Sequence, residues 1–302
     1  MGRERSIGRR AVLTAALLAP AACAAPAAPT TPAPPPDVSP QLAALEQRFA
    51  TRLGVYAVAT GDGRELAHRP DERFAHCSTF KVLAAGAILD RFPVEHLDVR
   101  VPIAAADVVA YSPVSGARVG VGMTIREAAD AALRYSDNTA GNLLLKQVDG
   151  PVGVTAFVRS LGDGVTRLDR WETELNTAIP GDERDTSTPR ALATDYRELV
   201  LGTRLDAAKR ELLRGWLLTN TTGDQRIRAG VPQGWQVGDK TGTGDHGSAN
   251  DVAIIWPPHG PPLVLAVLSG ADEPDAKPDN ALFVEVARIV TATLGQRAAG
   301  GG

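Results

Sequence analysis

The chain has 302 residues, of which 44% are hydrophobic and 22% are charged, and its net charge is −3 at pH 7. This length is enough for one large domain or two smaller lobes around a substantial core. The slightly negative charge gives no indication of a nucleic-acid partner, because proteins of that class carry clustered positive charge.

The first residues of the chain have the pattern of an export signal. A basic start that ends at Arg9-Arg10 is followed by an apolar stretch over 11–19 and then by small residues. That stretch is too short to span a bilayer, and its flanks are those of a cleaved signal. We therefore expect residues 1–23 to direct export, by the general secretory route or, given the arginine pair, by the twin-arginine route. The protein is then periplasmic, secreted or a cell-surface lipoprotein.

Cys23 and the segment after it are the next features. Cys23 follows two alanines where a lipid-attachment cysteine would stand, but Pro20 occupies the position at which lipoprotein signals normally carry leucine. A lipid anchor at Cys23 and a simple cleavage site therefore both stay open. Residues 24–40 are rich in alanine, proline and threonine, which predicts a disordered linker, and we expect a disordered tail at 297–302. Cys77 has no cysteine partner within the exported domain, so we expect no disulfide.

The first part of the exported domain predicts a helix and a β-hairpin. Apolar residues from Leu42 to Leu53 recur at helical spacing, which predicts a helix over 41–53. Residues 55–60 and 64–68 flank a Gly-Asp-Gly turn and therefore predict two paired strands.

The middle of the chain predicts helices. Residues 79–89 are apolar nearly all round, which is typical of a buried helix. Thr124 and Glu127 have the spacing of a capping box at a helix start, and Gly150-Pro151 is expected to stop another helix. The helices predicted in this part are 79–89, 124–134, 139–148, 155–161, 189–201 and 207–218.

The last part of the chain returns to β-rich runs and closes with a helix. These elements are predicted at 235–243, 249–256, 263–270 and 280–294. Strands at both ends of the chain indicate one sheet, and the fold class is α+β: an antiparallel five-stranded sheet flanked by helices, with an inserted all-helical lobe. We expect an active site at the junction of an α/β lobe and a helical lobe. The expected bounds are 41–76 and 219–296 for the α/β lobe and 77–218 for the helical lobe.

Ser78 and Lys81 form the first motif with a chemical interpretation. Residues three apart share one face of a helix, so Lys81 can reach the Ser78 hydroxyl and help to remove its proton. The free N–H groups at a helix start favour developing negative charge, and burial should lower the pKa of Lys81. Taken alone, the pattern is more often a capping serine followed by a surface lysine.

Two further motifs follow along the chain. Ser136 and Asn138 lie in a Ser-Asp-Asn loop between two predicted helices, where Ser136 can pass a proton to a leaving group and Asn138 can bind a substrate amide. Lys240 and Thr241 lie on a predicted strand and can hold a substrate carboxylate, while Gly242 allows a ligand to approach closely. Each motif alone is more often a capping turn or the end of a strand.

These three motifs, in this order, are the signature of class A β-lactamases and penicillin-binding proteins. The chain resembles the class A serine β-lactamases over essentially the whole exported domain, from about Leu42 to Leu294. The resemblance implies hydrolysis of the β-lactam amide through a serine acyl-enzyme, with Ser78 as nucleophile, and so antibiotic resistance. It implies a monomer that binds a small-molecule β-lactam and needs no metal or organic cofactor. The scattered histidines also offer no spaced pair of metal ligands.

The segment from Arg170 to Asn176 separates this class from penicillin-binding proteins. It resembles the Ω-loop of class A enzymes, so that Glu172 would be the general base that activates water for deacylation and Asn176 would help to hold that water. Asp185 would pair with Arg170 and close the loop. Many relatives have proline after the glutamate, whereas this chain has Thr173; we still expect the cis peptide bond that is common in the family at this point.

The substrate-binding residues include one departure from the family pattern. Many relatives carry an arginine on the strand after Lys-Thr-Gly, at the place of Ala249. Here Arg226 matches the position used by a subset of the family, and it would donate to the substrate carboxylate. Thr243 would line the same pocket and, with Ser78, supply the backbone N–H groups of the oxyanion hole. Tyr111 resembles the aromatic wall at the cleft mouth, although a core or surface tyrosine fits the sequence nearly as well.

The expected reaction has two halves. Ser78 attacks the lactam carbonyl after Lys81, or Glu172 through a water, takes its proton, and the sequence leaves these two bases open. Ser136 passes a proton to the leaving nitrogen, and Glu172 then activates the water that hydrolyses the acyl-enzyme. Two alternatives share the first three motifs: a penicillin-binding transpeptidase or carboxypeptidase, which lacks the Glu172 loop, and a non-enzymatic sensor that stays acylated.

Overall fold

The computed structural model describes residues 1–2 and 37–295 of the chain. The predicted export signal with Cys23, the predicted tail and most of the predicted linker therefore lie outside the described residues. The linker ends earlier than expected, because helix α1 (Ser39–Phe49) begins inside it. Pro40 fits this helix start, since the N–H that proline lacks has no helical partner in the first turn.

The prediction of one continuous helix over 41–53 is wrong at its end. Helix α1 stops at Phe49, Ala50 adopts a left-handed conformation with φ of 47°, and Leu53 already belongs to strand β1 (Arg52–Ala59). The helical spacing of Leu53 is therefore a coincidence: its side chain is buried as part of the strand. β1 pairs antiparallel with β2 (Glu65–His68), which confirms the hairpin.

The main sheet has five antiparallel strands in the order β2-β1-β9-β8-β7. The strands from the C-terminal part are β7 (Gln236–Thr243), β8 (Ala249–Trp256) and β9 (Leu263–Gly270). β9 pairs with β1, so the sheet joins the two ends of the chain as predicted. Two short pairs lie outside this sheet: β3 (Phe74–Ala75) with β6 (Thr186–Ser187), and β4 (Arg100–Val101) with β5 (Met123–Thr124).

The remaining helices lie close to their predicted bounds with two exceptions: the helix predicted at 155–161 begins at Gly150, and the short helix Ile227–Gly230 was not predicted. These helices are α2 (Phe80–Arg91), α3 (Ile125–Arg134), α4 (Asn138–Gln147), α5 (Gly150–Ser160), α6 (Pro189–Leu201), α7 (Ala207–Leu218), α8 (Ile227–Gly230) and α9 (Asn280–Leu294). The 3-10 turns are η1 (Cys77–Thr79), η2 (Val94–Asp98), η3 (Ala105–Asp107), η4 (Ser115–Arg118) and η5 (Glu174–Asn176). In the described part of the chain, we find no helix long and apolar enough to cross a membrane.

Two helix starts test the sequence reasoning. The capping box is confirmed, because Thr124 Oγ1 accepts from the Glu127 N–H and the Glu127 carboxylate accepts from the Thr124 N–H. The interpretation of Gly150-Pro151 as a simple stop is wrong, since the pair begins α5. Proline is tolerated in the first turn of a helix, so the same dipeptide separates α4 from α5 and opens the latter.

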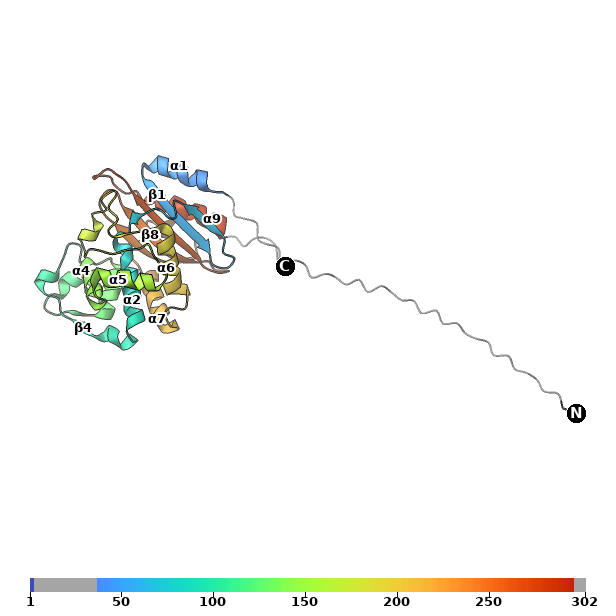
Figure 1. Cartoon of the computed structure of the whole chain (residues 1–302), viewed down its shortest axis with the longest axis horizontal. Helices are drawn as coiled ribbons and strands as arrows, with labels where there is room; N and C mark the ends of the chain where they lie inside the picture. Colours follow the sequence, from blue (N-terminus) through green and yellow to red (C-terminus); the bar gives the residue numbers. More distant parts are fainter. Residues whose placement is uncertain (3–36, 296–302) are drawn as a thin grey trace. The chain divides into compact units, whose positions relative to one another are not determined.

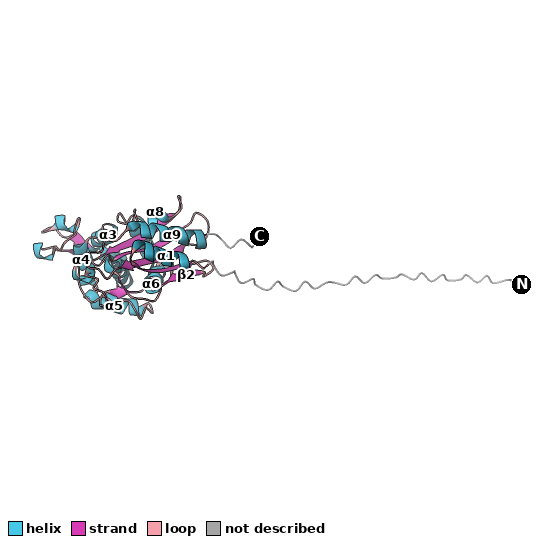
Figure 2. Cartoon of the chain, turned by 90° about the horizontal axis from the view of Figure 1, so that it is seen from above, coloured by secondary structure: helices cyan, strands magenta, loops and turns pink. Residues whose placement is uncertain are grey.

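Helices cover both faces of the sheet (Figure 1). Viewed from above, α1 and α9 lie together over one part of the sheet, away from α4 and α5 (Figure 2). Leu42 of α1 and Phe283 of α9 belong to one apolar cluster with the strand residue Val55. On the other face, α6 packs against β1, β8 and β9. This face shares a second apolar cluster with the helical part, in which α2 is buried along most of its length. The edge strand β7 lies against the turn η1 at the start of α2.

Candidate active site

Ser78 lies in the turn η1, immediately before the buried helix α2. It is 6% exposed, and Cys77 before it has a φ of 46°, in the left-handed region that non-glycine residues rarely occupy. Such strain is often retained at functional sites because the surrounding structure holds it. Burial raises the pKa of the Cys77 thiol to about 12. Cys77 is therefore a buried apolar neighbour of Ser78 rather than a nucleophile.

Lys81 brings the separate motifs together. Its Nζ lies 2.9 Å from Ser78 Oγ, 2.9 Å from the Ser136 carbonyl oxygen and 2.7 Å from Asn138 Oδ1. Glu172 Oε1 is a fourth neighbour, at 2.9 Å. The side chain of Lys81 is fully buried, and burial lowers the pKa of Lys81 although the Glu172 carboxylate acts in the opposite direction. A lysine with a lowered pKa can accept a proton from a serine hydroxyl near neutral pH.

The loop before α4 fixes the second motif through Asp137. This residue is fully buried. Its carboxylate accepts from Ser115 Oγ at 2.6 Å and from the backbone N–H groups of Val114, Ser115 and Ala140. Ser136 has a φ of 57°. Asp137 therefore has a structural role, and it presents Ser136 and Asn138 to the site from the two sides of a rigid turn.

Lys240 reaches the same loop from strand β7. Its Nζ donates to Ser136 Oγ at 3.0 Å and to the Thr241 carbonyl oxygen at 2.8 Å. Burial lowers the pKa of Lys240 well below its usual value, and the nearby Lys81 adds to this. The hydroxyl of Ser136 consequently lies next to a buried amine that can supply or receive a proton.

Glu172 is a neighbour of both Ser78 and Lys81. Its Oε1 is 3.4 Å from Ser78 Oγ, and its Oε2 accepts from Asn176 Nδ2 at 2.5 Å. Asn142 of α4 holds the backbone of Glu172 at both ends, because Glu172 N–H donates to Asn142 Oδ1 and Asn142 Nδ2 donates to the Glu172 carbonyl. The peptide bond between Glu172 and Thr173 is cis, as expected.

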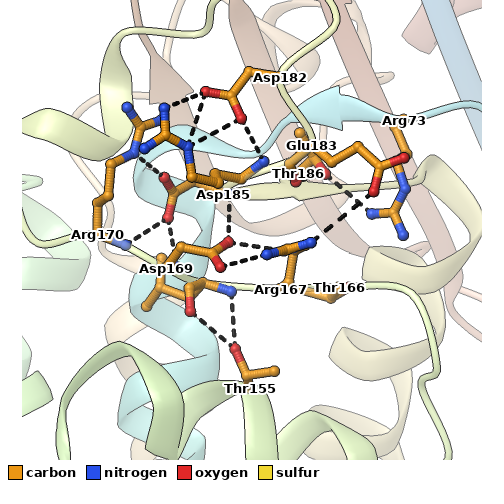
Figure 3. A network of polar contacts seen from close by, with 12 residues as sticks. Arg73, Thr155, Thr166, Arg167, Asp169, Arg170, Asp182, Glu183, Asp185 and Thr186 are labelled. Carbon is orange, nitrogen blue, oxygen red and sulfur yellow. Dashed lines mark hydrogen bonds and ion pairs between the residues drawn. The ribbon is translucent and has the colours of Figure 1, made fainter.

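The Ω-loop that carries Glu172 is closed by charged pairs (Figure 3). Arg170 Nε lies 2.5 Å from Asp185 Oδ2, and Asp185 Oδ1 accepts from the N–H groups of Asp169 and Arg170. Asp169 also pairs with Arg167 at 2.6 Å. The pairing of Arg170 with Asp185, which the family resemblance implied, is therefore present. It ties the two ends of an irregular segment to one buried carboxylate.

The guanidinium of Arg226 is hydrogen-bonded mainly to the end of strand β7 and the start of β8. The guanidinium donates from Nη1 to the carbonyl oxygens of Gly242 and Asn250, at 2.9 and 2.7 Å, and from Nη2 to Thr243 Oγ1 at 2.8 Å. Its Nε donates to Asn280 Oδ1 at 2.9 Å. Arg226 thus orients the Thr243 hydroxyl and leaves its guanidinium at the wall of the same pocket.

A cavity of about 390 Å³ joins these residues. Its lining consists of Ser78, Tyr111, Ser136, Asn138, Asn176, Thr222, Arg226, Thr241, Gly242 and Thr243. The predicted residues Lys81, Glu172 and Lys240 do not line the cavity, but they contact Ser78 and Ser136, which do. Tyr111 is 63% exposed, which agrees with a position at the mouth of the cavity and rules out the core.

Thr222 is the lining residue that the sequence reasoning missed. Its Oγ1 lies 2.5 Å from Thr241 Oγ1 and donates to Asn220 Oδ1 at 2.8 Å. Asn220 is in turn oriented by Asp239, which accepts from its Nδ2. No local pattern marks Thr222, because its place in the site depends on how the segment after α7 folds back on β7. Within the described residues there is also no cluster of His, Cys, Asp and Glu that could hold a metal ion.

Comparisons with known proteins agree with this geometry. Residues 37–294 match the model of the Beta-lactamase enzyme family. The chain is 58% identical to Beta-lactamase AST-1 of Nocardia asteroides, over 85% of this chain and 83% of that protein. It is 57% identical to Beta-lactamase FAR-1 of Nocardia farcinica, over 84% and 82% respectively.

Solved structures extend the similarity to the fold. The β-lactamase of Streptomyces albus G matches with a TM-score of 0.84 and 46% identity, over 86% of this chain and all of that one (100%). The class A β-lactamase of Clostridium kluyveri matches with a TM-score of 0.84 and 44% identity, over 85% and 98%. Sequence, fold and site geometry agree, and the chain belongs to the β-lactamase enzyme family, with the fold of its class A members.

Proposed function

We propose that this chain hydrolyses β-lactam antibiotics through an acyl-enzyme on Ser78, that Glu172 directs the water that releases the product, and that the activity confers resistance. One observation carries the proposal: Ser78 Oγ lies within reach of both Lys81 Nζ, at 2.9 Å, and Glu172 Oε1, at 3.4 Å. A nucleophile beside a buried amine can be acylated, and a nucleophile beside a fixed carboxylate can also be deacylated.

Acylation begins with proton removal from Ser78. The shorter contact and the lowered pKa of Lys81 favour Lys81 as the base that takes the proton directly. The oxygen of the lactam carbonyl then develops negative charge between the backbone N–H groups of Ser78 and Thr243, each worth roughly 3 kcal/mol to the transition state. Ser136 Oγ gives its proton to the departing nitrogen, and Lys240, which donates to Ser136 Oγ, replaces it.

Deacylation needs a water between Glu172 and the ester. Asn176 donates its Nδ2 to Glu172, and its Oδ1 is buried without a hydrogen-bond partner among the described residues. A buried acceptor of this kind is stabilised by a donor such as water. A water that donates to Asn176 Oδ1 and to Glu172 would stand beside Ser78, ready to attack the acyl carbonyl. Neither step requires a metal or an organic cofactor.

We also propose that the protein acts outside the cytoplasm and that it is a monomer. The N-terminal sequence pattern supports export by either route and leaves a lipid anchor at Cys23 open, and the family resemblance implies the monomer. Cell fractionation with mass determination of the mature N-terminus checks the export. A mature chain that retains residues 1–23 would contradict it, and a diacylglyceryl mass on Cys23 would establish the anchor.

Turnover counting tests the enzymatic proposal against its two rivals. The protein is mixed with excess chromogenic cephalosporin, and product molecules are counted per Ser78. A hydrolase gives many turnovers, whereas a sensor or a transpeptidase gives one burst and a lasting acyl mass adduct. In the Glu172→Ala variant we expect the reaction to stop at that adduct, and in Ser78→Ala we expect no adduct. A single burst from the unmodified protein would overturn the proposal.

A further inference from the structure

His76, two residues before the nucleophile, is fully buried and has a peptide carbonyl at each ring nitrogen. Nδ1 lies 3.0 Å from the Cys77 carbonyl oxygen, and Nε2 lies 3.1 Å from the Arg167 carbonyl oxygen. Carbonyl oxygens only accept, so both contacts are hydrogen bonds only when both nitrogens carry hydrogen. A neutral imidazole has one N–H, so the nitrogen that carries it decides which of the two carbonyl oxygens receives the hydrogen bond.

The contact at Nδ1 bears on the nucleophile. The Cys77 carbonyl and the Ser78 N–H belong to one peptide unit, and this N–H is a proposed donor of the oxyanion hole. A donor on the carbonyl side fixes the plane of the peptide and polarises it, which strengthens the N–H on the other side. The left-handed φ of Cys77, 46°, is unfavourable for a residue with a side chain, so the orientation of this peptide depends on such support.

The contact at Nε2 connects the same ring to the Ω-loop. Arg167 lies just before Asp169 and Arg170 at the closed end of that loop, and its N–H donates to the Thr186 carbonyl on the returning side. The backbone of His76 makes a matching contact, because its N–H donates to the Asp185 carbonyl at 3.1 Å. His76 thus joins the turn that carries Ser78 to both sides of the loop that carries Glu172.

The groups in contact with the ring of His76 are neutral: the ring of Phe80 and two peptide carbonyls. Phe80 packs against it with ring centroids 6.1 Å apart, and the Cys77 thiol stays protonated because burial raises its pKa to about 12. The charged side chains of the surrounding elements have partners of their own. These are Arg73 with the Val165 carbonyl and Thr186 Oγ1, Arg167 with Asp169, Arg170 with Asp185, and Lys81 with Glu172.

We propose that His76 is a positioning residue for the oxyanion hole: its Nδ1–H donates to the Cys77 carbonyl oxygen and holds the Cys77–Ser78 peptide, while its backbone N–H ties the same turn to the Ω-loop. The role rests on the proposed acylation of Ser78. It makes acylation depend on a residue that contacts no substrate, and it predicts that the two ring nitrogens contribute unequally, with Nδ1 the more important.

Kinetics of three variants separate the two nitrogens. Acylation by the chromogenic cephalosporin is measured in single turnovers, in a Glu172→Gln background that isolates this step. Asparagine places an amide near the position of Nδ1, glutamine places one near Nε2, and leucine has no donor. We expect His76→Leu to slow acylation about 10- to 100-fold, which is at or below the effect of deleting an oxyanion donor outright. His76→Asn should recover most of this loss and His76→Gln little. His259→Asn, at an exposed histidine, is the matched control and should change nothing.

Nitrogen NMR of histidine-labelled protein gives a readout that does not depend on activity. Nδ1 of His76 should carry bound hydrogen under the conditions of the acylation assay. Equal losses in His76→Asn and His76→Gln, or a ring whose hydrogen lies on Nε2 alone, would overturn the role. An unmodified protein that forms no acyl adduct would instead overturn the proposed function, a failure that the kinetics identify separately.

Discussion

The segment that carries Ser78 and Lys81 and the loop that carries Glu172 meet within 2.9 Å, but different forces hold them. Helix α2 is buried along most of its length among apolar side chains, and Lys81 is carried into the site by that packing. The Ω-loop is irregular, and it is held by Arg170 with Asp185, Arg167 with Asp169, and the amide of Asn142. In the proposed mechanism, acylation therefore depends on apolar packing and deacylation on charge pairs. The second half of the reaction should be the one that pH and loop mutations disturb.

The largest expected change in the reaction rates comes from removing the two proposed bases one at a time. Glu172→Gln keeps the shape of the side chain and removes its basicity, so deacylation should fall about 10³-fold while acylation changes far less. Lys81→Met should do the reverse, slowing acylation by a comparable factor. Rapid-quench mass spectrometry resolves the two rates. If both variants slowed the same step, the division between the two segments would be wrong.

Asp185→Asn tests the charged closure of the loop. Removing one partner of a largely buried pair typically costs about 3 kcal/mol, because the other charge stays buried without compensation. Arg170 is that partner, and its side chain is only 14% exposed. We expect a lower free energy of unfolding and a deacylation rate reduced more than the acylation rate. Asp182→Asn is the matched control, since its partner Arg184 is half exposed and such pairs contribute at most about 1 kcal/mol. Equal effects of the two substitutions would contradict the proposed closure.

Asn142→Ala removes the two hydrogen bonds that hold the Glu172 backbone to α4. Each lost bond typically costs about 1 kcal/mol, so the loop should loosen without unfolding. The expected result is a burst of acylation at nearly the normal rate, followed by turnover slowed about tenfold. A burst reduced as strongly as the steady state would show that Asn142 supports both segments.

Acid should weaken the loop before it weakens α2. The hydrogen bond from Arg167 holds the pKa of Asp169 below its usual 3.8, and Arg184 lowers that of Asp182 to about 2. A carboxylate whose pKa is lower in the folded protein stabilises it above the unfolded value, and that contribution is lost as pH falls through the folded value. The loop should therefore loosen between about pH 4 and pH 2. Hydrogen exchange of residues 167–185 and 80–91, corrected for intrinsic rates, checks this, and parallel opening of both segments would contradict it.

The elements with a clear helical period or a clear apolar run were predictable, and the positions that fit two patterns were not. α6, α7 and α9 have nearly the predicted bounds because burial of one face imposes a helical period, and β8 and β9 do because their buried and largely apolar runs end at turn residues. The first helix was predicted to continue to Leu53 because one apolar residue fits both a helical stripe and the start of a strand. Gly150-Pro151 was predicted to end a helix, but proline is also favourable in the first turn of one. Thr222 went unnoticed since nothing in its neighbours marks a site.

By itself the sequence determined the chemical groups: Ser78 with Lys81 on one helical face, the Ser136 and Lys240 motifs, and a glutamate in a loop that resembles the class A Ω-loop. Only the tertiary structure decided how they meet. It placed Glu172 within 3.4 Å of a serine 94 residues away, surrounded Lys81 with four acceptors, and put a carbonyl at each nitrogen of His76. These contacts join segments far apart in the chain through irregular loops. They depend on how the whole core packs, and no local period in the sequence encodes that.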